Sequence, residues 1–157
     1  MRTVLRVAKG TQAVFLLVYT AVLLLVTLVV QGGPGVKTNL DPLEDVRRLL
    51  TRARAGDVLS NAFLYAVVGL VGNVIMFAIW GFLAWKFLDG KDRRAWRTHL
   101  DVLLFGLILS VGIETIQAFL PTRAADVNDV FWNVLGTLLG QSIAHADRSL
   151  TFEWERT

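Results

Sequence analysis

The distribution of hydrophobic and polar residues divides the chain into four long apolar stretches separated by polar connections. The apolar stretches cover about residues 13–30, 61–88, 100–120 and 130–144. Because a helix needs ~17–25 largely apolar residues to cross a bilayer, the first three are long enough and the fourth is short. The first stretch exceeds the ~7–15-residue core of a signal peptide, so we expect it to be retained. The pattern predicts an all-α polytopic membrane protein with four transmembrane helices, in one domain over residues 1–157 with a loosely ordered polar tail at 145–157.

A short amphipathic helix is expected between the first two spans, over about residues 42–54. Asp41 suits the N-cap, Pro42 the first helical position and Glu44 the third, which together make a strong helix start. The apolar residues that follow share one face, and the arginines lie largely on the others. A helix of this kind typically lies in the plane of the membrane interface.

Composition supports a membrane protein and narrows its chemistry. Hydrophobic residues make up 54% of the chain, and the mean hydropathy is +0.54. A soluble domain would have an apolar share of about 45–50%. The chain has no cysteine, which excludes disulfides, thiolate metal sites and cysteine nucleophiles. A net charge of +3 is explained by basic loops beside a lipid bilayer, so no nucleic-acid partner is expected.

The basic residues also predict an orientation. Four spans place both termini on one side, together with the connection between the second and third spans, and ten lysines and arginines fall there. Six fall on the opposite side. Because basic residues favour the cytoplasmic side, we expect both termini in the cytoplasm and the turn between the third and fourth spans outside.

Polar residues are concentrated where the last two spans meet. Ser110, Glu114 and Gln117 share one face of the third span, at spacings i, i+4 and i+7. Since few residues separate these spans, they must pack as an antiparallel pair, and their polar faces should meet. Ionisable residues at membrane depth are functional hypotheses by default. The candidate ligand-binding site comprises Asn73, Ser110, Glu114, Gln117, Arg123, Asp126, Asp129 and Asn133.

Glycines at four-residue spacing predict where helices approach each other closely. Gly69 and Gly81 lie on one stripe of the second span, and Gly136 and Gly140 on one stripe of the fourth. Small residues on a stripe allow two transmembrane helices to pack backbone to backbone.

Three interpretations of the polar cluster remain open. It is a pocket for a headgroup or part of a glycan, a hydrogen-bonded clasp without a ligand, or the site of a membrane enzyme with Glu114 or Asp126 as general acid or base. Carboxylates can bind a divalent cation, but no spacing here is diagnostic of a metal site, and no cofactor motif is present. His99 and His145 are expected to lie apart, in a loop and in the tail, with solvated side chains.

The ordered polar and glycine positions of the last two spans resemble those of the VanZ-like family of integral membrane proteins. The matching residues are Ser110, Glu114, Gln117, Arg123, Asp126, Asp129, Asn133, Gly136 and Gly140. Asn39-Leu40-Asp41-Pro42 is similar to the family's N-L-x-P segment, and Asn73, Phe77 and Gly81 to its second-helix motif. One departure is Ile79, where the family usually has proline.

The resemblance runs from about residue 39 to 144 and supplies a phenotype and a location rather than a reaction. It implies a multi-pass protein of the bacterial cytoplasmic membrane, related to a protein linked to low-level resistance to teicoplanin, a lipoglycopeptide that acts outside that membrane. The expected partners are the lipid bilayer and a lipoglycopeptide or lipid-linked envelope precursor, and a homo-oligomer is compatible with the sequence.

Overall fold

The structure is a computed structural model that describes residues 9–30, 39–41, 43–90, 93–121 and 125–154, and helices account for most of them. No strand occurs in these ranges. Three helices are long and apolar enough to cross a membrane, over Lys9–Val29, Asn61–Leu88 and Ala95–Ala118. The elements are α1 (Lys9–Leu25), which continues into the π-helical turn η1 (Val26–Val30), α2 (Glu44–Arg54), α3 (Asn61–Leu88), α4 (Ala95–Ala118) and α5 (Val127–Trp154).

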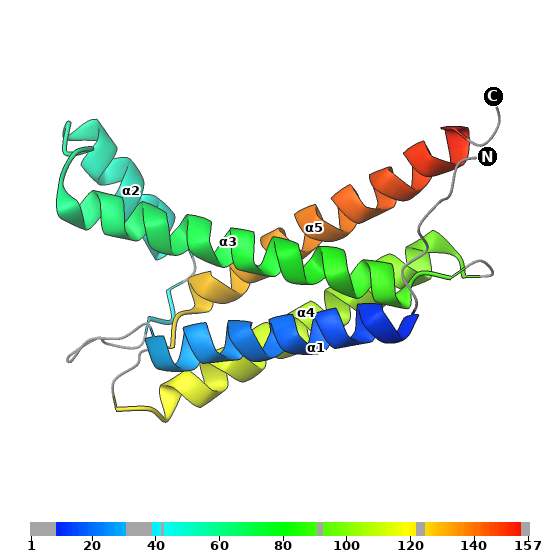
Figure 1. Ribbon diagram of the computed structural model, residues 1–157. Coiled ribbons are helices and arrows are strands. Elements are labelled where there is room, and N and C mark those ends of the chain that lie inside the picture. Colours follow the sequence, from blue (N-terminus) through cyan, green and yellow to red (C-terminus); the bar gives the residue numbers. More distant parts are fainter. Residues whose placement is uncertain (1–8, 31–38, 42, 91–92, 122–124, 155–157) are drawn as a thin grey trace.

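The long helices α1, α3, α4 and α5 alternate in direction along the chain, so α1 begins and α5 ends at the same end of the molecule (Figure 1). The short helix α2 lies beside the first turns of α3, at the opposite end. α3 runs unbroken from Asn61 to Leu88 and therefore passes through Ile79 without a break. The core between the long helices is built mainly from Leu23, Phe77, Trp80, Ala84, Trp85, Val102, Ile113 and Ala144.

The closest helix packing is between α3 and α5, and glycines make it possible. A Cβ atom at Gly81 would lie 2.6 Å from the carbonyl oxygen of Thr137 on α5. A Cβ at Gly136 or Gly140 would overlap the backbone of α3. Gly69 differs from the expectation, because no described atom lies within 4 Å of the place where its Cβ would stand. The predicted small-residue stripe of α3 therefore serves packing at Gly81 but not at Gly69.

Two predicted boundaries differ from the structure. α5 continues to Trp154 instead of ending near residue 144, because no glycine or proline interrupts residues 145–154. Helix α2 begins at Glu44, and Leu43 occupies its N-cap position with φ 66° and no side-chain cap. The prediction of Asp41 as N-cap is therefore wrong, and Pro42 lies outside the described residues. The backbone N–H of Leu43 donates instead to Oδ1 of Asn128 at 2.5 Å, so a residue from α5 fixes the start of α2.

α5 has an unusual distribution of side chains for a helix of a soluble protein. Asn133, Thr137 and Gln141, at successive four-residue intervals, are at most 2% exposed and face the other helices. Most exposed positions of the same helix as far as Ile143 are apolar, among them Phe131 and Ile143, and Ser142 is the polar exception. A polar stripe inside and apolar side chains outside suit surroundings of lipid rather than water.

Candidate functional site

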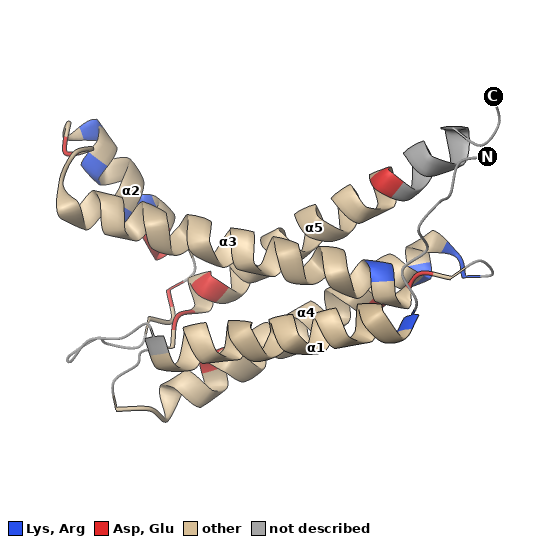
Figure 2. Cartoon of the chain, in the orientation of Figure 1, with Lys and Arg blue, Asp and Glu red and all other residues tan. Residues whose placement is uncertain are grey.

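Acidic residues gather at the end of the molecule where α4 ends, α5 begins and α2 comes close (Figure 2). Basic residues lie on α2 and at the opposite end, where α1 and α4 begin. We call the acidic group, formed by Asp45, Glu114, Asp126 and Asp129, the carboxylate cluster. Its members come from α2, α4, the segment before α5 and the first turn of α5.

Asp126 is the most fully bonded member of the carboxylate cluster. The side-chain amide of Asn39 donates to both of its oxygens, at 3.2 and 3.1 Å. The backbone N–H and side-chain amide of Asn128 both donate to Oδ1 at 2.8 Å. Backbone hydrogen bonds also join Asn39 to Ala125 and Val127 in a short parallel bridge. The segment before α2 and the segment before α5 are thereby tied together.

Asn128 also connects the segment before α2 to the segment before α5. It was not among the predicted site residues. Its side chain is buried, with 2% exposed. Besides bonding Asp126, it donates to the carbonyl of Asp41 at 3.2 Å and accepts from the N–H of Leu43. Each of its side-chain polar atoms therefore has a partner. The sequence signal that points to this arrangement is the similarity of the Asn39–Pro42 segment to the family's N-L-x-P motif, which marks Asn39 although not its partner.

Glu114 and Asp129 lie on the inner side of the hydrogen-bonded group formed by Asn39, Asp126 and Asn128. One oxygen of Glu114 accepts the backbone N–H of Asp126 at 2.7 Å, and its side chain is buried. The carboxylates of Asp126 and Asp129 are near enough to Glu114 to repel it electrostatically. Asn73 on α3 donates a side-chain hydrogen bond to Asp129, which is also repelled by Asp45. Within the described residues, none of the ion pairs formed by lysine or arginine involves a member of the carboxylate cluster.

The other predicted site residues lie apart from the carboxylate cluster. Ser110 and Asn133 are buried deeper between α4 and α5, where the amide of Asn133 donates to the serine hydroxyl at 2.9 Å. Gln117 donates to the backbone carbonyl of Thr27 in η1, at 3.0 Å, and so fastens α4 to the end of α1. Arg123, the expected partner of Glu114, lies outside the described residues.

This geometry distinguishes Asp126 from the other carboxyl groups of the cluster. Both oxygens of Asp126 are engaged by amide donors from Asn39 and Asn128, so its role is structural. Glu114 and Asp129 keep oxygens that can accept from a cationic or hydroxyl-bearing group. Among the residues that the structure describes, no group of three or more histidine, aspartate or glutamate side chains is arranged to hold a metal ion.

The two histidines are close together, contrary to the expectation that they lie apart. Nε2 of His99 is 2.8 Å from Nδ1 of His145, and the two rings are stacked with their centroids 5.0 Å apart. Trp85 on α3 packs against both rings, at centroid distances of 5.9 and 5.5 Å. The error has a physical cause: the predicted tail is helical, so it carries His145 alongside the first turns of α4.

Comparison with known proteins supports the resemblance in sequence. No curated protein and no solved structure matches the chain. The sequence model of the VanZ/LLP1 family matches residues 14–148, a range that includes the carboxylate cluster, both histidines and the close packing of α3 and α5. Since the match covers most of the 157 residues, the chain belongs to the VanZ/LLP1 family.

Proposed function

We propose that this VanZ-like membrane protein binds an amphiphilic or lipid-linked component of the cell envelope at the carboxylate cluster, and that it thereby contributes to resistance to lipoglycopeptides of the teicoplanin type. Glu114 and Asp129 contact a cationic or hydroxyl-rich group of the ligand. Asn73 orients Asp129, and the bonds of Asp126 to Asn39 and Asn128 hold the rim of the site in place.

The observation that carries the proposal is the proximity of two buried carboxyl groups, Glu114 and Asp129, that pair with no lysine or arginine among the described residues. Charged side chains near a bilayer are costly and are normally paired. The nearby arginines of α2 have other carboxylate partners: Arg47 pairs with Asp41, and Arg48 with Glu44. A ligand that brings a positive charge or several hydroxyl groups would relieve the repulsion between the two carboxylates.

The proposal also states on which side of the membrane the carboxylate cluster lies. We infer that α5 is a fourth span, because Asn133, Thr137 and Gln141 face inward and most of its exposed residues as far as Ile143 are apolar. Four spans with the observed alternation place the start of α1 and the end of α5 on one side of the bacterial cytoplasmic membrane. The bias of basic residues favours the cytoplasm for that side, so the carboxylate cluster lies at the outer leaflet, where a lipoglycopeptide acts.

The test is teicoplanin susceptibility in a Gram-positive host that lacks its own homologue. The host expresses the wild type, Glu114→Gln, Asp129→Asn or the control Asp57→Asn, at matched membrane levels. Asp57 is a half-exposed carboxylate between α2 and α3 that pairs with Arg52 at 3.1 Å, and such pairs contribute little to stability. We expect the wild type and the control to protect several-fold and the two cluster variants to lose protection.

Equal protection by all four proteins would make the carboxylate cluster a structural clasp. Absence of protection by the wild type itself would overturn the resistance role. In that case, binding of purified protein to lipoglycopeptides and to lipid-linked envelope precursors decides whether the ligand proposal survives.

A further inference from the structure

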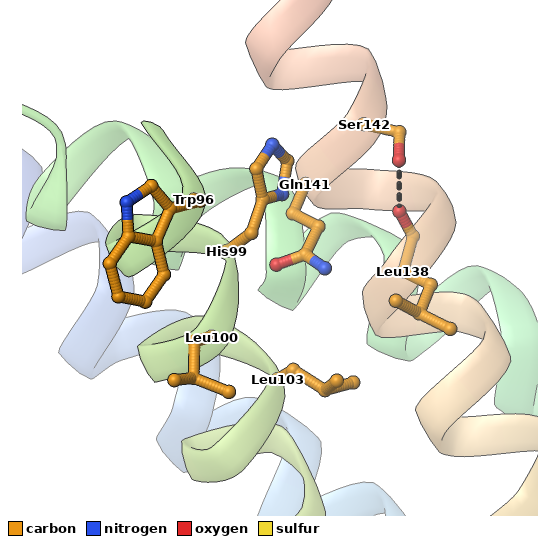
Figure 3. A pocket seen from close by; sticks show the side chains of 7 residues that line it. All are labelled: Trp96, His99, Leu100, Leu103, Leu138, Gln141 and Ser142. Atoms are coloured by element: carbon orange, nitrogen blue, oxygen red, sulfur yellow. Dashed lines mark hydrogen bonds between the residues drawn. The ribbon is translucent and has the colours of Figure 1, made fainter. Parts of the chain in front are cut away.

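A pocket of about 460 Å³ opens between α4 and α5 at the end of the molecule opposite the carboxylate cluster (Figure 3). Its wall is largely apolar and includes Leu100, Leu103 and Leu138. Leu100 is 56% exposed and Leu138 is 38% exposed, so the wall faces the surroundings of the protein. The pocket lies near the start of α4, one of the helices able to span a membrane. An opening in this position is at the depth where lipid headgroups meet acyl chains.

A buried polar acceptor lies within this apolar wall. Gln141 is only 2% exposed, and its Oε1 makes no close hydrogen bond with a described residue, although its side chain interacts with the imidazole of His99. Figure 3 shows the carboxamide between His99 and Leu138, with its oxygen directed toward the interior of the pocket. Burying an amide oxygen without a hydrogen bond is unfavourable. A ligand that brings a donor to this position would remove that cost.

The back of the pocket is held in a fixed position. His99 lines it and is stacked on His145, and Trp85 packs against both rings. Three aromatic rings in mutual contact restrict one another's rotation. The wall that presents Gln141 is therefore organised before any ligand arrives, which lowers the entropic cost of binding.

The rim of the pocket carries a positive charge. Trp96 lines the opening and is 56% exposed. The guanidinium of Arg97 lies over the Trp96 ring, 5.4 Å from its centroid. Arg97 is exposed and forms no ion pair with another described residue. An arginine at the rim favours a ligand with an anionic group beside its hydrogen-bond donor.

From these features we propose that the pocket binds an anionic phospholipid with a hydroxyl-bearing headgroup, of the phosphatidylglycerol class. An acyl chain lies along the leucine wall, the phosphate meets Arg97 beside Trp96, and a headgroup hydroxyl donates to Oε1 of Gln141. Phosphatidylcholine has the chains and the phosphate but no headgroup donor and no net negative charge. The pocket therefore distinguishes the two lipids.

Tryptophan fluorescence tests this in reconstituted vesicles, because bromine on an acyl chain quenches an indole at short range. The full chain is placed in phosphatidylcholine vesicles that contain a minor share of brominated phosphatidylglycerol or of brominated phosphatidylcholine. The chain has five tryptophans, so the contribution of Trp96 is obtained by comparison with Trp96→Phe. We expect Trp96 to be quenched several-fold more by the brominated phosphatidylglycerol.

Variants test which pocket residues cause the preference for phosphatidylglycerol over phosphatidylcholine. Gln141→Leu removes the acceptor and is expected to abolish the preference, whereas Gln12→Leu, the same change on α1, is expected to keep it. Arg97→Gln changes an exposed side chain and is expected to weaken the preference even if Gln141→Leu fails to fold. Equal quenching by the two lipids in the wild type, or an unchanged preference in both Gln141→Leu and Arg97→Gln, would overturn the proposal.

Discussion

At the scale of single residues, the site depends on amides that hold a carboxylate. Asn39 and Asn128 together donate to both oxygens of Asp126, and Asn128 also bonds the two backbone segments that flank Pro42. A hydrogen bond to a charged group contributes about 1.5–3 kcal/mol. Several such bonds outweigh the unfavourable left-handed backbone of Leu43, which costs on the order of 1–3 kcal/mol. The distorted start of α2 is therefore explained by the bonds of Asn128 to Asp41 and Leu43, with Asn128 itself held by Asp126.

Asp45 gives this region a pH dependence. Burial raises the pKa of the Asp45 carboxyl above its ordinary value; the nearby Asp126 carboxylate adds to the effect, and Arg48 opposes it. A carboxyl whose pKa is higher in the folded protein makes folding less favourable once it ionises. This cost is absent below the unfolded pKa, at about pH 4, and is fully present above the folded pKa. We expect Asp45→Asn to raise the Tm in detergent at neutral pH, with the gain disappearing toward pH 4.

The dipole of α2 opposes the expected gain in the Tm of Asp45→Asn. Asp45 lies in the first turn of α2, where the helix dipole favours a carboxylate by about 0.3–1 kcal/mol. We expect burial and the neighbouring Asp126 to outweigh the dipole. A Tm for Asp45→Asn below that of the wild type at neutral pH would show the reverse. Asp57→Asn is the matched control, and its Tm at neutral pH is expected to be close to that of the wild type.

At the scale of elements, the crossing of α3 and α5 fixes how the rest of the bundle packs. We expect Gly140→Ala to destabilise the protein, because its Cβ would overlap the carbonyl of Ala78 and the helices would have to move apart. Overpacking of this kind costs about 1–3 kcal/mol. Gly112→Ala on α4 is the control, since nothing described lies within 4 Å of its Cβ position. Alanine there should be neutral or stabilising by about 0.5–1 kcal/mol.

Thermal unfolding of the two alanine variants in the same detergent measures this difference. A similar loss of stability in both would mean that the close contact of α3 and α5 does not limit stability. Similar stability of Gly140→Ala and the wild type would mean that the helices cross less closely than the structure shows.

The elements show which features local sequence can predict. Long apolar runs identify α1, α3 and α4 closely, because the bilayer requires a minimum apolar length. The end of α5 was missed because its last turns are polar and only their lack of glycine and proline indicates a helix. The start of α2 was missed because Asn128, far away in the chain, determines it. The stacking of His99 on His145 was missed for the same reason, since it depends on how α4 and α5 are aligned.

In the candidate site, too, local sequence predicts which residues face inward but not which residues bond to each other. The spacing of Glu114, Asp129 and Asn73 predicts their convergence, because each lies on the inward face of a packed helix. The local pattern did not separate Ser110 and Asn133, which bond to each other, from the carboxylate cluster. Position along a helix gives the face on which a residue lies, whereas its partner depends on the depth at which the neighbouring helix crosses.

At the scale of the whole molecule, the ends of the bundle differ in charge and α5 connects them. The carboxylate cluster lies at one end, and the basic residues outside α2 gather at the other (Figure 2). Between them, α5 buries Asn133, Thr137 and Gln141 against its neighbours. These side chains make α5 more polar than the three helices that are apolar enough to cross a membrane, although they face inward. An ion pair joins Lys86 at the end of α3 to Asp147 near the end of α5.

The absence of native cysteine allows a direct test of the four-span topology. Single cysteines are introduced as Ala55→Cys between α2 and α3, Gly90→Cys between α3 and α4, and Ala146→Cys near the end of α5. A Cβ at Gly90 would approach no described atom more closely than 4.0 Å, so the fold tolerates it. Whole cells are treated with a membrane-impermeant maleimide before and after permeabilisation.

If α5 crosses the membrane with the polar stripe turned inward, positions 90 and 146 lie on the same side. With both termini in the cytoplasm, only Ala55→Cys reacts in intact cells, and the other two react after permeabilisation. Reaction at position 146 together with 55, but not 90, would mean that α5 does not cross. Reaction at 90 and 146 without 55 would keep four spans but reverse the orientation. The carboxylate cluster would then face the cytoplasm, where a lipoglycopeptide acting outside the cell could not reach it.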